Sequence, residues 1–326
     1  MISQKTAIPV LIIILVFWLT GGAFGQKFPS KPIRFIVPYA AGGSTDTMAR
    51  LIAKPLEKEL GQKIFVENIP GGSTKVGAVQ CQKANPDGYT IMQAAGLAWI
   101  GLYYSKSIDY KLWEKLTALG NNALESYGFY EVRAESPFKT WADLVKFAKE
   151  NPGKLTCGIS SRGTYDLMLE DVARSFDIKF KHVPFTGAGP GGVALLGGHI
   201  DFRFCVPSEA ITMLRAGKTR GLAIQTEKRL ASIPEVPTFK EMGHDVRTVT
   251  ATRAIWGPPN MSRDIVDLYS RAIEKSTKDP EFVTMAENTF VSTAEFWPGS
   301  KVIESIKAAD LWQAPKLTDF YSKNQN

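Results

Sequence analysis

The chain has 326 residues, of which 44% are hydrophobic and 22% are charged, and its formal net charge is +7. Its Lys and Arg residues are interspersed with acidic residues and form no basic motif with aromatic side chains, so the composition argues against a nucleic-acid partner. The three cysteines (Cys81, Cys157 and Cys205) and the three histidines lack metal-ligand spacing. We therefore expect no metal site and no cofactor.

Residues 1–25 predict a cleaved secretory signal peptide. Lys5 gives a positive start, an apolar run follows from Ala7 to Leu19, and small residues precede a cleavage point at Gln26. The run is shorter than the roughly 20 residues that a transmembrane helix needs, although an uncleaved membrane anchor is the alternative. We expect the mature protein to be exported to the periplasm.

The rest of the chain alternates β-like runs with amphipathic helical runs, a pattern typical of a parallel sheet with helices on both faces. The first helical run has Met48, Ile52 and Leu56 on one face, and Gly61 is its expected C-cap. The expected strands of this first block are Ile33–Val37, Ile64–Val66 and Thr90–Ala94.

A similar block restarts after Pro137, where Thr140 and Asp143 predict a capping box for a helix to about Glu150. Its expected strands are Leu155–Gly158, Phe180–Val183, Ile200–Phe204 and Arg220–Ile224. The segment from about Val249 has helical character but too few strands for a domain, so we expect it to return to the first block. The sequence thus predicts an α/β protein with a central cleft between two lobes: residues 26–122 with 250–326, and residues 123–249.

Three loops rich in glycine and hydroxyl residues open helices, at residues 42–46, 160–164 and 186–190. In open parallel sheets, ligands bind beyond the carboxyl ends of the strands. Glycine lets the backbone approach a ligand, and the free N–H groups of a helix start attract anions. Each loop alone is equally compatible with a tight turn, but three on facing lobes predict a shared anion site.

Several motifs resemble the TctC or Bug family, the receptors of tripartite tricarboxylate transporters. They occur in the family's order over about residues 27–242, and the resemblance is weaker over residues 99–130 and beyond residue 244. The motifs are Pro29 to Asp46, Val66 to Gly72, Asn85 to Thr90, Asn151 to Leu155, His182 to Gly187, Leu195 to Asp201, Ala216 to Lys218 and Pro234 to Thr238. The resemblance implies a type II periplasmic-binding-protein fold that closes like a flytrap.

The resemblance also implies that amides, hydroxyls and ordered waters of two facing loops hold a ligand carboxylate. The positions that match in the first loop are Tyr39, Ala41, Gly42, Gly43, Ser44 and Asp46. Those in the second lobe are Thr186, Gly187, Ala188 and Gly189, with Ser160, Ser161 and Thr164 flanking them. We expect Asp46 to cap its helix or order its loop, because like charges repel.

Departures from the family pattern bear on specificity. Thr186 stands where lysine is usual, and Cys205 stands where an acidic residue is frequent. We expect Arg162 to pair with the distal end of the ligand, the alternative being a solvated surface arginine. In this fold type Cys157 and Cys205 end neighbouring strands, and export would permit a disulfide, which the sequence leaves open.

No catalytic motif emerges from the sequence. Residues 158–163 lack the spacing of a nucleophile elbow, and Gly217-Lys-Thr219 lacks the first glycine of a phosphate-binding loop. We therefore expect a monomeric, non-enzymatic receptor that delivers a small organic carboxylate to integral membrane transporter subunits. The alternative partner is the periplasmic domain of a sensor kinase.

Overall fold

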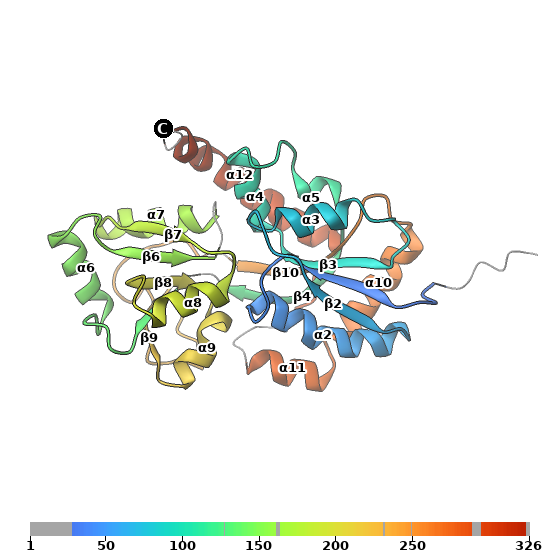
Figure 1. The fold of residues 1–326 in the computed structure, drawn as a ribbon, viewed down its shortest axis with the longest axis horizontal. Helices are drawn as coiled ribbons and strands as arrows, with labels where there is room; N and C mark the ends of the chain where they lie inside the picture. The colour runs from blue at the N-terminus through green and yellow to red at the C-terminus, as the bar shows by residue number, and fades with distance from the viewer. Residues whose placement is uncertain are drawn as a thin grey trace, which may run out of the picture.

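The computed structural model describes residues 28–126, 128–160, 164–230, 232–248, 250–288 and 295–323. The predicted signal peptide lies outside these residues. The described chain forms two lobes, each built on a five-stranded sheet covered by helices (Figure 1). This arrangement confirms the predicted two-lobed α/β fold.

The first sheet has the order β2-β1-β3-β10-β4 and the second has the order β7-β6-β8-β5-β9. The strands of the first sheet are β1 (Ile33–Val37), β2 (Ile64–Asn68), β3 (Thr90–Ala95), β4 (Thr117–Ser126) and β10 (Thr250–Gly257). Those of the second are β5 (Phe129–Arg133), β6 (Thr156–Ile159), β7 (Lys181–Pro184), β8 (Phe202–Cys205) and β9 (Thr219–Ile224).

Both sheets are mixed, whereas the sequence pattern indicated parallel strands alone. β10 runs antiparallel to both β3 and β4, and β5 runs antiparallel to both β8 and β9. Antiparallel neighbours need no crossover helix between them, so the alternation of strands and helices in the sequence does not reveal them.

The chain crosses between the sheets twice. It leaves the first sheet at the end of β4 and enters the second at β5, and it returns through residues after β9 to β10 (Figure 1). The C-terminal segment therefore supplies a central strand to the first sheet. The residue at which one lobe gives way to the other stays a prediction.

Local sequence signals account for two helix ends. Helix α2 (Ser44–Leu60) buries Met48, Ile52 and Leu56 and ends at Gly61, whose left-handed φ of 67° lets its N–H bond to the Glu57 carbonyl. Helix α6 (Trp141–Glu150) begins with the predicted capping box. The Thr140 hydroxyl accepts from the Asp143 amide at 3.2 Å, and the Asp143 carboxylate accepts from the Thr140 amide at 2.8 Å.

The remaining helices cover the sheets and link the lobes. They are α3 (Lys75–Gln82), α4 (Leu97–Tyr104), α5 (Leu112–Lys115), α7 (Thr164–Phe176), α8 (Ala188–Leu196), α9 (Pro207–Arg215), α10 (Arg263–Ser276), α11 (Pro280–Glu287) and α12 (Gly299–Lys323). Helix α12 packs on β4 and α4 of the first lobe and also on α7 of the second (Figure 1). In the described part of the chain, no helix has both the length and the apolar character needed to cross a bilayer.

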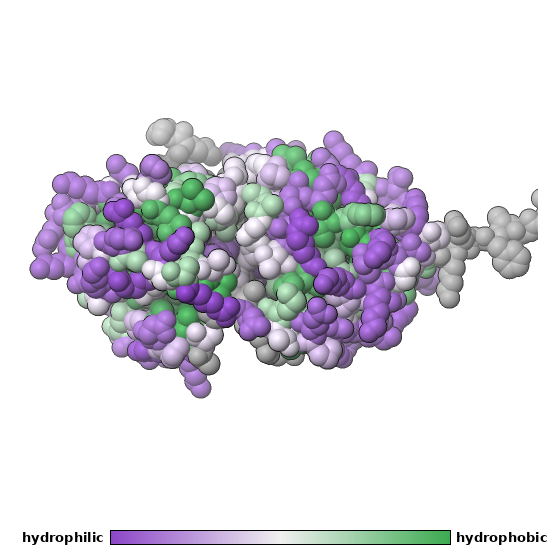
Figure 2. Space-filling view, turned by 60° about the horizontal axis from the view of Figure 1, so that its bottom comes forward, coloured by the Kyte–Doolittle hydropathy of each residue, from purple (hydrophilic) through white to green (hydrophobic). Residues whose placement is uncertain are grey.

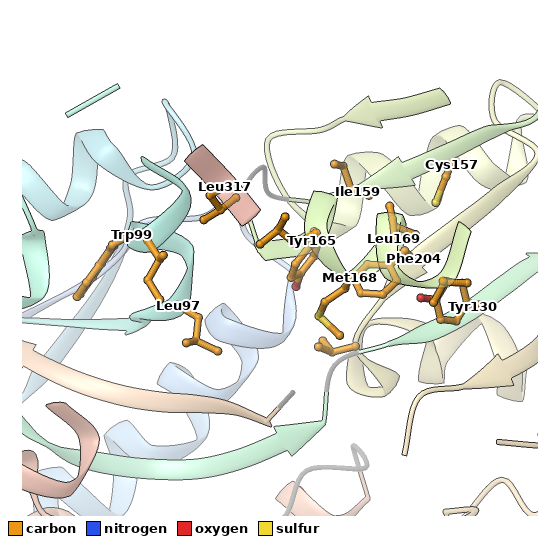
Figure 3. Close-up of a cluster of buried hydrophobic side chains, with 14 of the residues drawn as sticks. Leu97, Trp99, Tyr130, Cys157, Ile159, Tyr165, Met168, Leu169, Phe204 and Leu317 are labelled. Atoms are coloured by element: carbon orange, nitrogen blue, oxygen red, sulfur yellow. The ribbon is translucent and has the colours of Figure 1, made fainter. Parts of the chain in front are cut away.

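One hydrophobic cluster runs through both lobes along these helices. Trp99 of α4, Leu317 of α12 and Tyr165 of α7 belong to it, and Figure 3 shows it continuing to Phe204 and Tyr130 of the second sheet. All five side chains are buried. The lobes therefore share apolar packing on the side where α12 lies.

Candidate functional site

A narrow cavity lies between the loop ends of the two sheets, and Figure 2 shows the molecule hollowed between its halves. The free space at its centre is only about 20 Å³, and the empty space reaches about 450 Å³ when gaps that open to solvent are included. The described residues that line it from the first lobe are Tyr39, Gly43, Ser44, Thr45, Ala98 and Arg253. Those from the second lobe are Ser160, Tyr165, Ala188 and Glu209.

Several helices begin at this cavity. Ser44 is the first residue of α2, Ala188 is the first residue of α8, and Glu209 lies in the first turn of α9. The N-terminal turns of helices carry unpaired N–H groups and a partial positive charge. The surroundings of the cavity therefore favour a negatively charged group.

Asp46 holds the first loop in place. One carboxylate oxygen accepts from the Gly42 amide at 2.9 Å, and the other accepts from Arg50 and Asn68 at 3.0 Å each. Asn68 also donates to the Tyr39 carbonyl at 3.1 Å. Burial opposes ionisation of Asp46, but these hydrogen bonds outweigh it and lower the pKa of the carboxyl. Asp46 thus orders the loop, as expected.

The loops of the two lobes meet with little between them. A Cβ placed on Gly187 would lie 3.5 Å from the Ala40 Cβ, and one on Gly189 would lie 3.7 Å from the Ala41 carbonyl oxygen. These are ordinary contact distances. The facing loops therefore approach closely at Gly187 and Gly189, with room there for a methyl group but for no larger side chain.

A buried arginine, Arg253, lines the cavity on the side of the first lobe. Arg253 of β10 is 3% exposed, and its two Nη atoms donate to the Thr45 hydroxyl at 2.8 Å and the Ser44 hydroxyl at 2.6 Å. The Ser44 hydroxyl in turn donates to the Glu209 carboxylate of the other lobe at 3.4 Å. A charged hydrogen-bond chain therefore crosses from one lobe to the other.

Tyr39 contributes a hydroxyl to the same wall. Burial raises its pKa to about 12, while Arg253 acts to lower this pKa and Glu209 acts to raise it. At neutral pH the hydroxyl stays protonated, so it is available as a hydrogen-bond donor.

A second buried arginine supports the wall of the other lobe. Arg203 of β8 forms an ion pair with Glu131 of β5, whose Oε1 accepts from its Nε at 2.7 Å. Its two Nη atoms donate to the carbonyls of Ala188 at 2.9 Å and Glu209 at 3.1 Å. Arg203 thereby fixes the first turns of α8 and α9 against the sheet.

The structure distributes the predicted site residues unevenly around the cavity. Tyr39, Gly43, Ser44, Ser160 and Ala188 line it. Ala41, Gly42 and Gly187 lie in the loops beside it, and Asp46 and Gly189 lie in the first turns of α2 and α8. Ser161 and Arg162 lie outside the described residues.

Three further predicted residues, Thr186, Thr164 and Cys205, are not among the described residues that line the cavity. Thr186 is exposed. Thr164 is buried, and its hydroxyl lies 3.1 Å from the Leu97 carbonyl and 2.9 Å from Gln313 Oε1, both of the first lobe. Cys205 is buried behind the wall, where its thiol lies 3.7 Å from Glu131.

The cysteines are free, so the disulfide that the sequence left open does not form in this structure. Cys157 of β6 pairs in register with Phe202 of β8, three residues before Cys205. Three residues of strand correspond to roughly 10 Å, which is beyond the reach of a disulfide.

Sequence reasoning missed Ala98, Tyr165, Glu209 and Arg253. Thr45 lies in the predicted loop at residues 42–46 but was not among the expected ligand-binding residues. Arg253 carried a usable signal, because it is the sole charged residue between Thr250 and Gly257 in a strand that is otherwise apolar or small. A charge in such a position is costly to bury unless it has partners, which makes it a candidate for a site. Glu209 had no such signal in the sequence, because acidic residues are common in the first turn of a helix.

Comparisons with known proteins agree with the two-lobed fold. The family model described as "Tripartite tricarboxylate transporter family receptor" (TctC) matches residues 48–297. A Cupriavidus necator protein of the UPF0065 group is 37% identical over 80% of this chain and 79% of its own length. A solved structure titled as a periplasmic transporter is 29% identical, with a TM-score of 0.81 over 91% of this chain and 98% of the other. MatC from Rhodopseudomonas palustris with bound malate has a TM-score of 0.79 at 24% identity, over 90% of this chain and all of its own. The chain therefore belongs to the TctC family of tripartite tricarboxylate transporter receptors, the Bug-type solute-binding proteins.

Proposed function

We propose that this protein is a non-enzymatic periplasmic receptor that closes its lobes over a small organic carboxylate and delivers it to the membrane subunits of a tripartite transporter. The observation that carries the proposal is the cavity between the lobes, where helix starts and glycine-rich loops from both sides converge. Such a site offers N–H donors to an anion without a side chain in the way.

In this function the ligand carboxylate bridges the two loops. The first lobe offers the amides of Ala41 and Gly43 and the hydroxyls of Tyr39 and Ser44, while the second offers Ser160 and the amides of residues 187–189; the Gly42 amide is bonded to Asp46. Arg253 adds a buried positive charge next to Ser44. Because both lobes contact the ligand only when closed, binding stabilises the closed form over the open one.

Two further observations support this assignment. The matched family is described as a transporter receptor, which favours a transporter over a sensor kinase as the partner. MatC, a structural neighbour with the same fold, holds malate, which is a small carboxylate. The apolar N-terminal segment supports export with residues 1–25 removed. We propose that the exported protein acts as a monomer.

Ligand binding tests the proposal directly. Residues 26–326 are produced, native mass spectrometry identifies any ligand that co-purifies, and thermal unfolding is measured with a panel of aliphatic, dicarboxylic, amino-acid and aromatic carboxylates. A ligand at about 100 times its Kd stabilises the folded state by about 2.7 kcal/mol, which raises Tm by roughly 5 °C. Small-angle scattering should show a smaller radius of gyration with the same ligand. A protein whose Tm responds to no carboxylate contradicts the proposal.

Delivery and export have their own measurements. Cells that produce the receptor with its membrane partners should take up the radiolabelled carboxylate, and cells without the receptor should not. N-terminal sequencing of the exported protein should begin at Gln26. Uptake that is independent of the receptor contradicts the delivery step while leaving ligand binding intact.

A further inference from the structure

We propose that helix α12 helps to hold the two lobes closed through a buried hydrogen-bond cluster, so that residues outside the cavity contribute to ligand affinity. The cluster joins Thr164 of the second lobe to Gln313 and the Leu97 carbonyl of the first, and we call it the interlobe latch. This inference rests on the proposed function, because it concerns the closure of the lobes over a carboxylate.

Helix α12 is anchored on the first lobe before it reaches the second. Val302 and Ile306, in its first two turns, are buried, and the helix packs on β4 and α4. The Asp310 carboxylate forms an ion pair with Lys111 at 2.7 Å. Helix α12 therefore belongs to the first lobe, and each contact that its later turns make with α7 joins the two lobes.

The latch lies where these later turns meet the start of α7. Thr164 is the first residue of α7 and is 2% exposed, while Gln313 is fully buried. The Thr164 hydroxyl lies 2.9 Å from Gln313 Oε1 and 3.1 Å from the carbonyl of Leu97, the first residue of α4. Both partners that the described chain gives this hydroxyl therefore belong to the first lobe.

The hydrogen atoms of the latch allow two bonds at once. A hydroxyl has one hydrogen, so Thr164 makes both bonds only if one of its partners donates to it. The NH2 group of Gln313 does so when the side-chain amide is turned over, and Nε2 is otherwise buried without a partner among the described residues. Two hydrogen bonds then run from α12 through Thr164 to α4.

Three further side chains of α12 contact the second lobe beside the latch. Leu317 is fully buried in the cluster that it shares with Tyr165 of α7 (Figure 3). Lys316 Nζ lies 3.3 Å from Asp171 of α7, and the Trp312 ring centre lies 4.3 Å from the guanidinium of Arg247. Lys316 and Arg247 are at least partly exposed, so their contacts contribute less than the buried latch.

The latch adjoins the cavity without lining it. Ala98, which follows Leu97, lines the cavity from the first lobe, and Tyr165, which follows Thr164, lines it from the second. The latch thus joins the two walls without using a ligand atom. Hydrogen bonds between the lobes form only when the lobes are together, so they favour the closed form and slow the release of a bound carboxylate. One net hydrogen bond corresponds to about fivefold in an equilibrium constant.

Variants of the latch test this inference with the carboxylate of the panel that raises Tm most. Calorimetry on residues 26–326 measures its affinity, and stopped-flow kinetics measure its dissociation rate. Thr164→Val removes the hydroxyl, so the carboxylate should bind about fivefold more weakly and dissociate faster. Thr164→Ser keeps the hydroxyl and should bind within about twofold of the wild type. Gln313→Ala removes one of the two bonds and should weaken binding by about twofold to threefold.

A matched control separates the latch from a general loss of stability. The Thr117 hydroxyl donates to the Pro258 carbonyl at 2.7 Å, and both residues belong to the first lobe. Thr117→Val should therefore lower Tm and leave the affinity and the dissociation rate of the carboxylate unchanged.

The outcomes also separate the latch from the receptor function. Equal affinity and dissociation rate for Thr164→Val and Thr164→Ser overturn the latch and leave the receptor function standing. A loss for Thr164→Val that Gln313→Ala does not share overturns it too, because α12 then takes no part, and so does an equal loss for Thr117→Val. Failure of every carboxylate to bind overturns both. The two Thr164 variants decide the question if Gln313→Ala does not fold.

Discussion

The two walls of the cavity are held in place by different means. On the first lobe, the Asp46 carboxylate accepts hydrogen bonds from the Gly42 amide and from the Arg50 side chain, which is exposed. On the second lobe, Arg203 and Glu131 form a pair that is almost completely buried, and they hold α8 and α9 from behind. The first arrangement is local in sequence and near solvent, and the second joins distant segments in the protein interior. The two should therefore differ in how much stability each contributes and in how each responds to pH.

The largest effect is expected from breaking the buried pair. Arg203→Leu leaves the Glu131 carboxylate in the interior without its cation and removes the donor from two carbonyls. We expect the free energy of unfolding to fall by about 3–5 kcal/mol. Urea unfolding measures this change. Arg229→Leu is the matched control, because Arg229 and Glu241 form an exposed pair on the same lobe and should contribute less than about 1 kcal/mol.

A double variant separates stability from positioning. Glu131→Leu combined with Arg203→Leu removes both charges, so most of the lost stability should return, because apolar pairs often replace buried ion pairs at little cost. Carboxylate affinity should stay reduced, since Ala188 and Glu209 still lack the donor that fixes their turns. Recovery of both stability and affinity would show that Arg203 does not position the wall.

The local network of the first lobe should give a smaller effect that depends on pH. Asp46→Asn removes a charge that accepts three hydrogen bonds, and we expect a loss of about 2 kcal/mol at pH 7. Because the fold lowers the pKa of Asp46 below its unfolded value of about 3.9, its contribution is present above that pH and is lost as the pH falls through the folded pKa.

Urea unfolding at pH 7, 5, 4 and 3 checks this sign. The difference between the wild type and Asp46→Asn should be constant at pH 7 and 5 and should shrink at pH 3. Asp109→Asn, at an exposed carboxylate of the same lobe, should change stability little at any pH. A difference for Asp46 that persists at full size at pH 3 would contradict the role of its charge.

The same contrast explains what the sequence can predict. The capping box of Thr140 and Asp143 and the C-cap at Gly61 are local, so their residue types alone predicted them. The role of Asp46 in its loop was predicted from like-charge repulsion at a position that the family resemblance supplied. Arg253, Glu209 and the pair of Arg203 with Glu131 act across lobes or strands that are far apart in the chain. Their partners follow from the antiparallel placement of β10 and β5, which no local pattern contains.

The smallest expected effects on stability and affinity come from replacing two adjacent glycines of the first loop, Gly42 and Gly43, with alanine. Gly42 has φ of +81° with no atom within 4 Å of an added Cβ, so Gly42→Ala costs backbone strain alone, about 1 kcal/mol. Gly43 has φ of −80°, and an added Cβ would lie 3.7 Å from the Ala40 carbonyl oxygen and 3.9 Å from the Ala188 Cβ of the other lobe. Gly43→Ala should therefore leave stability unchanged or raise it by up to about 1 kcal/mol, since alanine restricts the unfolded chain.

Carboxylate affinity should fall more for Gly43→Ala than for Gly42→Ala, because the methyl group added at residue 43 would enter the cavity where the loops of the two lobes meet. Thermal unfolding without ligand, followed by calorimetry with the best carboxylate of the panel, measures both quantities. If Gly42→Ala lost more affinity and Gly43→Ala lost more stability, the backbone of this loop would not have the role in ligand binding that its geometry indicates.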